Sequence, residues 1–117
     1  MAATAEADRE LIARWARGCR GRIVDAGCGP GHWTAYLHDL GLEFEGVDPV
    51  ERFVKIARAQ HPHVTYRQGS FAGLPAGSYG AVLAWYSVIH IPPQDLAGTL
   101  TSLRDSLEPQ GLSLIHI

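Results

Sequence analysis

The chain has 117 residues, with 10 Lys or Arg against 12 Asp or Glu and a formal net charge of -2 at pH 7. This length suffices for one domain with a hydrophobic core, and the balanced charge without a basic run gives no support for a nucleic-acid partner. The two cysteines make no disulfide framework, and no stretch is apolar for long enough to be a signal peptide or a membrane span. We therefore expect a cytoplasmic domain with no membrane partner.

The first part of the chain has the pattern of a helix followed by a buried strand. Residues 4–17 are predicted to be helical, with Leu11 and Ile12 on the apolar face. Residues 21–26 form a short run that is too apolar for the edge of a sheet. We therefore expect a helix packed on a sheet and a central strand that carries Asp25 near its end.

Glycines follow Asp25 at every second position, namely Gly27, Gly29 and Gly31. Only glycine lets the backbone turn this sharply and come into contact with a ligand. A helical pattern begins directly afterwards, with an apolar stripe made by Trp33, Tyr36, Leu37 and Leu40. The segment is therefore predicted to be a strand, a glycine loop and a helix, in which the loop N–H groups and the positive helix end face a polar ligand.

The next strand is predicted over residues 42–48. Apolar residues alternate there with Glu43 and Glu45, which indicates that one face of the strand is partly exposed to water. Asp48 ends the strand about 20 positions after Gly27, the spacing of an acid that binds a ribose in nucleotide-binding α/β folds. The same carboxylate could cap the following helix, and it could do both.

Residues 50–60 form that helix, and its charged side chains are predicted to face water without a further role. They are Glu51, Arg52, Lys55 and Arg58. His61 and His63 then flank a proline, a spacing that could indicate a metal site. No Cys, Asp or Glu stands at ligand spacing nearby, so we interpret the two histidines as a surface turn and predict no bound metal. A third strand is predicted at residues 64–68.

Residues 79–85 are a continuous apolar run, which predicts a central strand buried on both faces. A turn at residues 74–78 precedes this strand. A helix follows the strand and ends at residues 109–111. The leucine stripe of that helix is Leu96, Leu100, Leu103 and Leu107. With a fifth strand beginning at residues 112–117, this order predicts an α/β fold with a doubly wound parallel sheet, which binds ligands beyond the carboxyl ends of its strands.

The spacing of the loop glycines after Asp25, D-x-G-x-G-x-G, resembles motif I of the class I S-adenosylmethionine-dependent methyltransferases. A dinucleotide-binding loop needs G-x-G-x-x-G, and here His32 occupies the place of its third glycine. The resemblance covers residues 9–111 and implies a Rossmann-like sheet of strand order 3-2-1-4-5. The sheet is incomplete, with five strands of the usual seven, so residues 1–117 are expected to be one truncated domain that binds S-adenosyl-L-methionine.

The resemblance also implies roles for individual residues around the cofactor. The glycine loop would hold its methionine end, and Asp48 would accept both ribose hydroxyls. Ser70 stands where the family commonly has an Asp that contacts the adenine, Phe71 can lie against the base, and Gly80 stands where another acid is common. The implied cofactor-binding residues are Asp25, Gly27, Cys28, Gly29, Gly31, Asp48, Pro49, Ser70, Phe71 and Trp85.

The chemistry that the resemblance implies is transfer of a methyl group from a sulfonium to a nucleophile by in-line displacement. The main task of the protein is then to align the acceptor and to exclude water. A base is needed only where the acceptor must lose a proton. His90 is the first candidate for this catalytic role and Tyr86 the second, although His90 can equally be a polar residue beside a helix. The acceptor is expected to be a small molecule.

Two other functions stay open at this point. An NAD(P)-dependent oxidoreductase would use the same architecture, but the glycine spacing and the missing chain for a substrate domain count against it. A non-catalytic fragment that binds the cofactor weakly or not at all is the third interpretation, because the chain is short for a complete methyltransferase domain.

The sequence stops inside its fifth strand. Residues 112–117 are apolar and would leave a free strand edge, so we expect the chain to self-associate through that edge. These six residues also resemble the translation of a transposase adapter used in sequencing libraries. We therefore expect them to be non-native and the chain to be a gene fragment.

Overall fold

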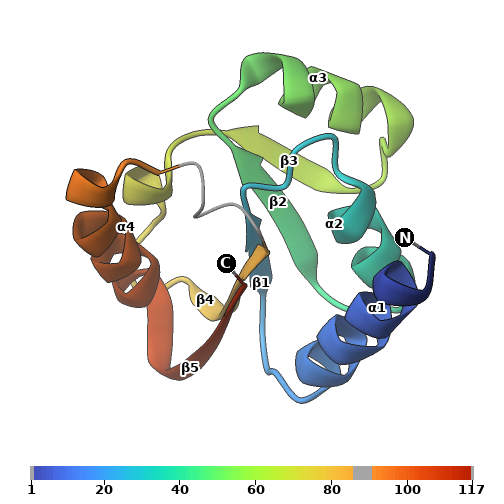
Figure 1. The fold of residues 1–117 in the computed structure, drawn as a ribbon, viewed down its shortest axis with the longest axis horizontal. Coiled ribbons are helices and arrows are strands. Elements are labelled where there is room, and N and C mark those ends of the chain that lie inside the picture. Colours follow the sequence, from blue (N-terminus) through green and yellow to red (C-terminus); the bar gives the residue numbers. More distant parts are fainter. Residues whose placement is uncertain (1, 86–90, 117) are drawn as a thin grey trace.

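The computed structural model describes residues 2–85 and 91–116, whose strands form one parallel sheet (Figure 1). The strands are β1 (Ile23–Ala26), β2 (Phe44–Asp48), β3 (Thr65–Gln68), β4 (Tyr79–Trp85) and β5 (Leu107–His116). Their order across the sheet is β3-β2-β1-β4-β5. The predicted strand order is confirmed, and the carboxyl ends of β1, β2 and β3 meet at one edge because all the strands are parallel.

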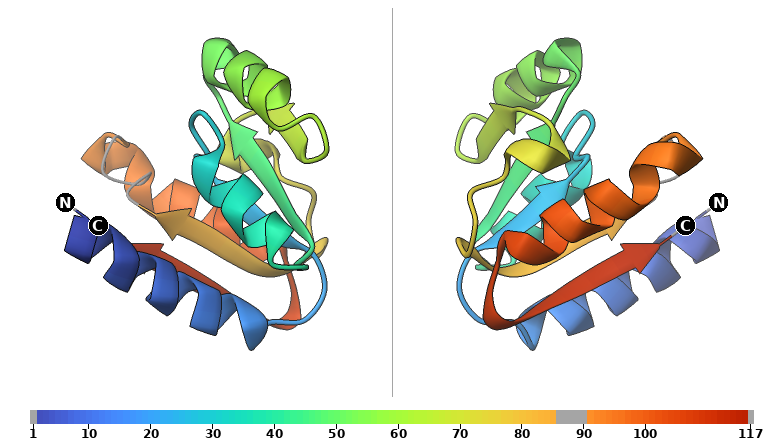
Figure 2. Two further views of the ribbon diagram at one scale, coloured as in Figure 1. Left: turned by 90° about the vertical axis from the view of Figure 1, so that its right-hand side faces the viewer. Right: turned by 90° about the vertical axis from the view of Figure 1, so that its left-hand side faces the viewer.

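Helices cover both faces of the sheet, as predicted for a doubly wound fold (Figure 2). They are α1 (Ala2–Arg17), α2 (His32–Asp39), α3 (Glu51–Gln60), α4 (Pro93–Asp105) and the short 3₁₀ helix η1 (Phe71–Gly73). Successive residues of a strand point to opposite faces. Ile23 of β1 therefore packs with Ile12 of α1 and Leu37 of α2, whereas Val24 packs with Leu103 of α4. Within the described residues, we find no helix with the length and apolar character that a membrane span requires.

The predicted apolar stripes are buried only in part: Ile12, Leu37 and Leu103 are buried, whereas other predicted members are exposed. In α1, Ala13 and Ala16 are buried and Leu11 is 49% exposed; in α2, Ala35 is buried and Leu40 is 38% exposed. Small residues on the inward face let a helix approach the sheet closely, so the larger apolar side chains lie at the rim of the contact. Leu100, which belongs to the predicted leucine stripe, is exposed in the same way.

The prediction that one face of β2 is partly exposed to water is wrong, as Glu45 shows. All five residues of β2 are buried, and 5% of the Glu45 surface is exposed. The hydroxyl of Tyr79 donates to Glu45 Oε1 at 2.5 Å, while Arg67 Nη2 and Arg22 Nη1 lie 3.5 and 3.9 Å from Oε2. Burial and the bond to Glu45 raise the pKa of Tyr79 to about 12. Partners from three other segments compensate this buried carboxylate, as a buried charge requires.

Gly80 stands near the start of β4, at the place where the family resemblance puts an acid. An added Cβ would lie 1.7 Å from the carbonyl oxygen of Arg20, far inside the 3.0 Å that real Cβ contacts respect. The N–H of Gly80 also donates to the carbonyl oxygen of Arg22 at 2.9 Å. No side chain fits here, so an acid at this position would require the backbone to move apart.

The start of β5 was predicted to be the end of the preceding helix. Leu107 pairs with Tyr79, and Leu112 pairs with Ala81, so several residues of β5 face one residue of β4 in a bulge. Gln110 lies in this bulge with a φ of 68°. From Leu112 onward the strand pairs regularly with β4, in agreement with the predicted fifth strand.

Candidate functional site

The glycine loop connects β1 to α2 at the carboxyl edge of the sheet. Gly27, Gly29 and Gly31 have φ angles of 82°, 55° and 90°, a region that residues with a side chain rarely adopt. Gly31 directly precedes α2, and its N–H donates to the carbonyl oxygen of Cys28 at 3.1 Å. The predicted order of strand, glycine loop and helix is therefore confirmed.

Three N–H groups of the loop bind β2 and that of Gly31 binds within the loop, so the prediction that they face a ligand is wrong. Those of Gly27 and Cys28 donate to the carbonyl oxygen of Val47 at 2.7 and 3.1 Å, and that of Gly29 donates to the side chain of Asp48. These bonds fix the loop on the neighbouring strand. The available donors lie instead in the first turn of α2, because these groups have no intrahelical acceptor and the glycine before them has no side chain to cap them.

Asp48 ends β2 and is 6% exposed. Its Oδ2 accepts the N–H of Gly29 at 2.9 Å, and its Oδ1 accepts the N–H of Val50 at 2.8 Å. Asp48 thus holds both the glycine loop and the residue that precedes α3, but no described side chain caps this helix, so the predicted cap is wrong. A carboxylate offers about four lone-pair sites, so each oxygen can still accept one hydrogen bond from a ligand.

The carboxylate of Asp25 binds the helix that follows the loop and not the loop N–H groups. Its Oδ2 accepts the hydroxyl of Thr34 in α2 at 2.8 Å, and the residue is 3% exposed. Burial raises the pKa of Asp25 from 3.8 to about 6, although the Thr34 hydrogen bond opposes this rise and the charge of Asp48 adds to it. The sequence did not single out Thr34. The feature that could have indicated its role is that it is a polar residue on the buried face of a helix.

Tyr66 of β3 fills the space behind the glycine loop, a role that the sequence did not reveal. Its hydroxyl donates to the carbonyl oxygen of Gly31 at 2.8 Å. An added Cβ would lie 2.7 Å from its ring at Gly31 and 2.6 Å from it at Gly46. Arg58, predicted only to face water, donates from Nε and Nη2 to the Tyr66 carbonyl oxygen at 3.0 and 2.8 Å. The loop therefore rests on a packed layer of α3 and β3.

Cys28 lies in the loop as a buried, neutral thiol. Burial raises its pKa, and the charges of Asp25 and Asp48 raise it further. Its Sγ contacts the carbonyl oxygen of Gly29 at 3.5 Å. Because the thiolate is the reactive form of cysteine, Cys28 is suited to packing and not to nucleophilic chemistry.

The space beside Gly29 is open. An added Cβ there would meet no described atom within 4 Å, in contrast to the crowded positions at Gly31 and Gly46. The N–H of the same glycine binds buried Asp48, and the first turn of α2 begins shortly after it. An open space thus adjoins a carboxylate and the positive end of a helix.

The other predicted site residues lie at the same edge or outside the described part of the chain. Pro49 is exposed directly after β2, and Ser70 is exposed between β3 and η1. Phe71 is half-buried and packs with the cluster that contains Val47. Outside the described residues lie the side chain of Trp85 and the whole of Tyr86 and His90.

A hollow among the described residues lies elsewhere. It has a volume of about 410 Å³ and is lined by Gly80, Arg20 and residues 108–112, near the amino-terminal ends of β4 and β5. In a parallel sheet this is the edge opposite the glycine loop, so the hollow is not part of the site.

Comparison with known families distinguishes between the two cofactor classes that the sequence left open. The model of a family described as a methyltransferase domain matches residues 23–111. The chain belongs to this methyltransferase family. Its class is the class I S-adenosylmethionine-dependent one, and its cofactor is S-adenosylmethionine. The alternative of a dinucleotide-dependent oxidoreductase is not favoured.

Relatives of this methyltransferase domain are longer than the chain. A probable S-adenosylmethionine-dependent methyltransferase of Mycolicibacterium smegmatis is 31% identical over 105 residues, which cover 87% of this chain and 40% of that protein. The magnesium-protoporphyrin O-methyltransferase of Rhodobacter capsulatus is 32% identical over 91 residues, which cover 74% and 40%. A solved structure of a Pyrococcus horikoshii protein superposes with a TM-score of 0.83 at 26% identity, over 93% of this chain and 54% of that one. The chain therefore spans about half of these proteins or less.

The raised pKa of Asp25 predicts how the stability of this methyltransferase domain depends on pH. Between the ordinary value of 3.8 and the folded value of about 6, the folded chain holds a proton that the unfolded chain has released. The stability that Asp25 contributes is therefore complete below about pH 4 and is lost as the pH rises through about 6, a change on the order of 3 kcal/mol.

We expect Asp25→Asn to match the wild type near pH 4 and to be more stable at pH 7. The amide oxygen can still accept a hydrogen bond from the Thr34 hydroxyl. The difference in unfolding free energy between the two proteins therefore measures the effect of the buried charge. Urea unfolding of both proteins at several pH values measures it. A difference in unfolding free energy that stays constant from pH 4 to 7 would show that Asp25 is ionised in both states.

Proposed function

We propose that the protein to which this chain belongs transfers the methyl group of S-adenosylmethionine to a small-molecule acceptor, with the cofactor bound at the glycine-loop edge. The observation that carries the proposal is the open space at Gly29, whose N–H binds the buried carboxylate of Asp48 and which lies shortly before the uncapped first turn of α2. The name of the Rhodobacter capsulatus relative, with its porphyrin acceptor and oxygen methylation, supports a small molecule as the acceptor.

Three parts of the site suit three parts of the cofactor. The free N–H donors at the start of α2 suit its carboxylate, because a helix N-terminus attracts an anion. Asp48 has lone pairs left for the two ribose hydroxyls. Ser70 and Phe71 follow β3 at the same edge and suit the adenine, with Pro49 beside them. The loop residues would hold the methionine end of the cofactor, and Trp85 would lie at the mouth of the site.

Buried Asp25 contributes a negative charge behind the loop when it is ionised. When bound, the cofactor supplies a methyl group on a positively charged sulfur. A nearby negative charge favours a cation, so binding and the ionisation of Asp25 support each other.

His90 and Tyr86 follow the end of β4 in the sequence, and we place them on the acceptor side of the site. His90 would take the proton of an acceptor that must lose one, and Tyr86 is the second candidate. His90→Ala is then expected to lower kcat while the Kd for S-adenosylhomocysteine stays unchanged. An unchanged kcat would assign His90 a structural role and leave catalysis to alignment alone.

The cofactor position is tested by filling the open space. Gly29→Val places a side chain where the cofactor would lie, and we expect it to abolish calorimetric binding of S-adenosylhomocysteine. Gly77→Val is the matched control, because Gly77 has a φ of 61° against 55° for Gly29 and equally open surroundings. Both variants carry the same backbone strain, so circular dichroism should show similar folding. Equal binding by the two variants would contradict the proposed cofactor position.

A further inference from the structure

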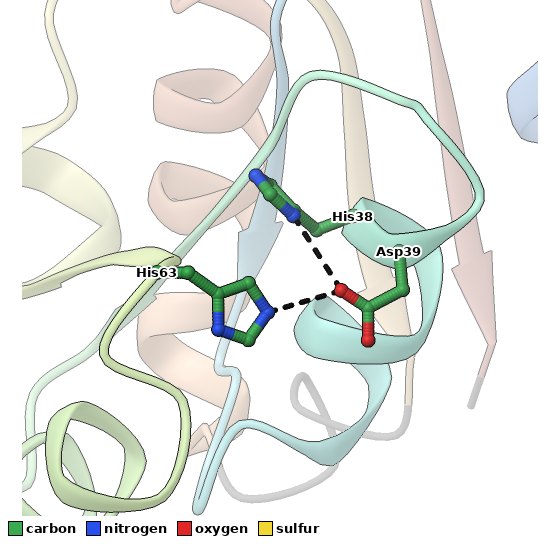
Figure 3. A group of neighbouring side chains, drawn as sticks. All are labelled: His38, Asp39 and His63. Carbon is green, nitrogen blue, oxygen red and sulfur yellow. Dashed lines mark hydrogen bonds and ion pairs between the residues drawn. The ribbon is translucent and has the colours of Figure 1, made fainter.

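We propose that His38, Asp39 and His63 form a binding site for a divalent transition-metal cation, with Zn²⁺ as the ion of choice. The residues come from two segments that the fold brings together: the end of α2 supplies His38 and Asp39, and the turn before β3 supplies His63. Figure 3 shows the three side chains pointing toward one another. This site is separate from the cofactor site and does not depend on the proposed function.

The distances between the three side chains suit a small metal ion. Asp39 Oδ1 lies 3.0 Å from His63 Nε2 and 3.8 Å from His38 Nδ1, and one ligand atom from each residue lies within 4.8 Å of the others. In a tetrahedral zinc site with bonds of 2.0–2.1 Å, neighbouring ligand atoms are about 3.3 Å apart. The two separations from Asp39 Oδ1 lie within about 0.5 Å of this value, so side-chain adjustments can bring the three ligand atoms to bonding distance of one ion.

His38 Nδ1 is a buried polar atom with no hydrogen-bond partner among the described residues. Such atoms are rare in folded proteins and call for an explanation, of which a bound ion or water is one. At 3.8 Å, the carboxylate of Asp39 is too far away to form a hydrogen bond with it. A cation between the two atoms would satisfy both of them.

The electrostatics and rigidity of the surroundings support a cation here. His38 and Asp39 end α2, where the carbonyl groups of the last turn give the helix a partial negative charge that favours cations. The turn that carries His63 is held by the backbone bonds from His61 N to Ala57 O at 2.9 Å and from Val64 N to His61 O at 3.1 Å. Two nitrogen ligands and one carboxylate suit Zn²⁺ better than Mg²⁺ or Ca²⁺.

The site has room for a further ligand. His63 and Asp39 are exposed, and His38 borders a hollow of about 280 Å³ that Glu43, Phe44 and Thr65 also line. Three protein ligands would leave the fourth tetrahedral position to water. Because the glycine loop precedes the other end of α2, a bound ion would act by tying this helix to the turn before β3, and not by contacting the cofactor.

The test is titration of the chain, without a polyhistidine tag, with Zn²⁺ in a calorimeter and with Co²⁺ as a spectroscopic probe. We expect one bound ion, visible absorption from tetrahedral Co²⁺, and a rise in Tm on the order of 10 °C when the free metal exceeds its Kd about 100-fold. His63→Ala and Asp39→Ala should each weaken binding at least about tenfold, since even residues that only orient metal ligands matter by 10–100-fold. Both side chains are exposed, so both variants should fold as the wild type does by circular dichroism.

His32→Gln is the matched control, because His32 is an exposed histidine at the opposite end of the same helix. It should bind Zn²⁺ and Co²⁺ as the wild type does. An absence of saturable binding would overturn the proposal. So would an unchanged affinity in His63→Ala and Asp39→Ala, because the metal would then be held elsewhere, for example at Cys19.

Discussion

Gly80→Ala is expected to destabilise the domain by at least about 3 kcal/mol, and it can prevent folding. The added Cβ would lie 1.7 Å from the carbonyl oxygen of Arg20, which is backbone and cannot rotate away as a side chain could. Relief requires β4 to move from β1, which would disturb the pairing of Ile23 with Ala81 and the hydrogen bond from Gly80 N to Arg22 O. Overpacking that shifts the backbone typically costs 1–3 kcal/mol, and each lost hydrogen bond adds about 1 kcal/mol.

Urea unfolding followed by circular dichroism measures this effect. Gly98→Ala is the matched control, because Gly98 lies in α4 and an added Cβ there meets nothing within 4 Å. Alanine is the better helix former, so this variant should be more stable than the wild type by about 0.5–1 kcal/mol. A midpoint for Gly80→Ala equal to that of the wild type would show that the close approach of Arg20 is wrong.

Asp48→Asn is expected to weaken cofactor binding about 100-fold or more. The substitution keeps the size of the side chain but removes the charge and replaces one acceptor oxygen by a donor. The new amide would face the N–H of Gly29 or of Val50, which now donate to the carboxylate at 2.9 and 2.8 Å. Two charge-assisted hydrogen bonds to the ribose, at about 1.5–3 kcal/mol each, account for the loss.

Glu51→Gln is the matched control for Asp48→Asn. Glu51 is an exposed acid at the start of α3 that pairs with Lys55 at 3.1 Å on the surface, and such pairs contribute little. Titration calorimetry with S-adenosylhomocysteine should give a wild-type Kd for Glu51→Gln. Unfolding curves of both variants separate a lost cofactor contact from lost stability. If Asp48→Asn is folded and binds as tightly as Glu51→Gln, the ribose assignment is wrong.

The sheet could be predicted from the sequence because its signals are local. The continuous apolar run of residues 79–85 has no helical period, and the structure places β4 over Tyr79–Trp85 as predicted. Partners from distant segments left no such signal. Glu45 looked like a wet position because Tyr79, Arg67 and Arg22, which compensate its charge, come from other segments. The start of β5 was missed because its bulge has the composition of a turn.

The sequence predicted which residues lie in the candidate site, but it did not predict which groups they contact. Glycine spacing placed the loop, and chain spacing placed Asp48 beside it, because both follow from the order of strand and helix. The acceptors of the loop N–H groups could not be predicted, since Val47 and Asp48 approach the loop only when β2 pairs with β1. From the sequence we rejected His63 as a metal ligand for the same reason. Asp39, which lies next to His63 in the fold, is far from it in the sequence.

Calorimetric titration of the chain with S-adenosylhomocysteine, and with NAD in parallel, tests the central claim most directly. The claim is that the glycine loop, Asp48 and the first turn of α2 form a site for S-adenosylmethionine. It predicts saturable binding of one S-adenosylhomocysteine per chain and no saturable heat with NAD. Saturable binding of NAD, or no binding of S-adenosylhomocysteine by the folded chain, would contradict it.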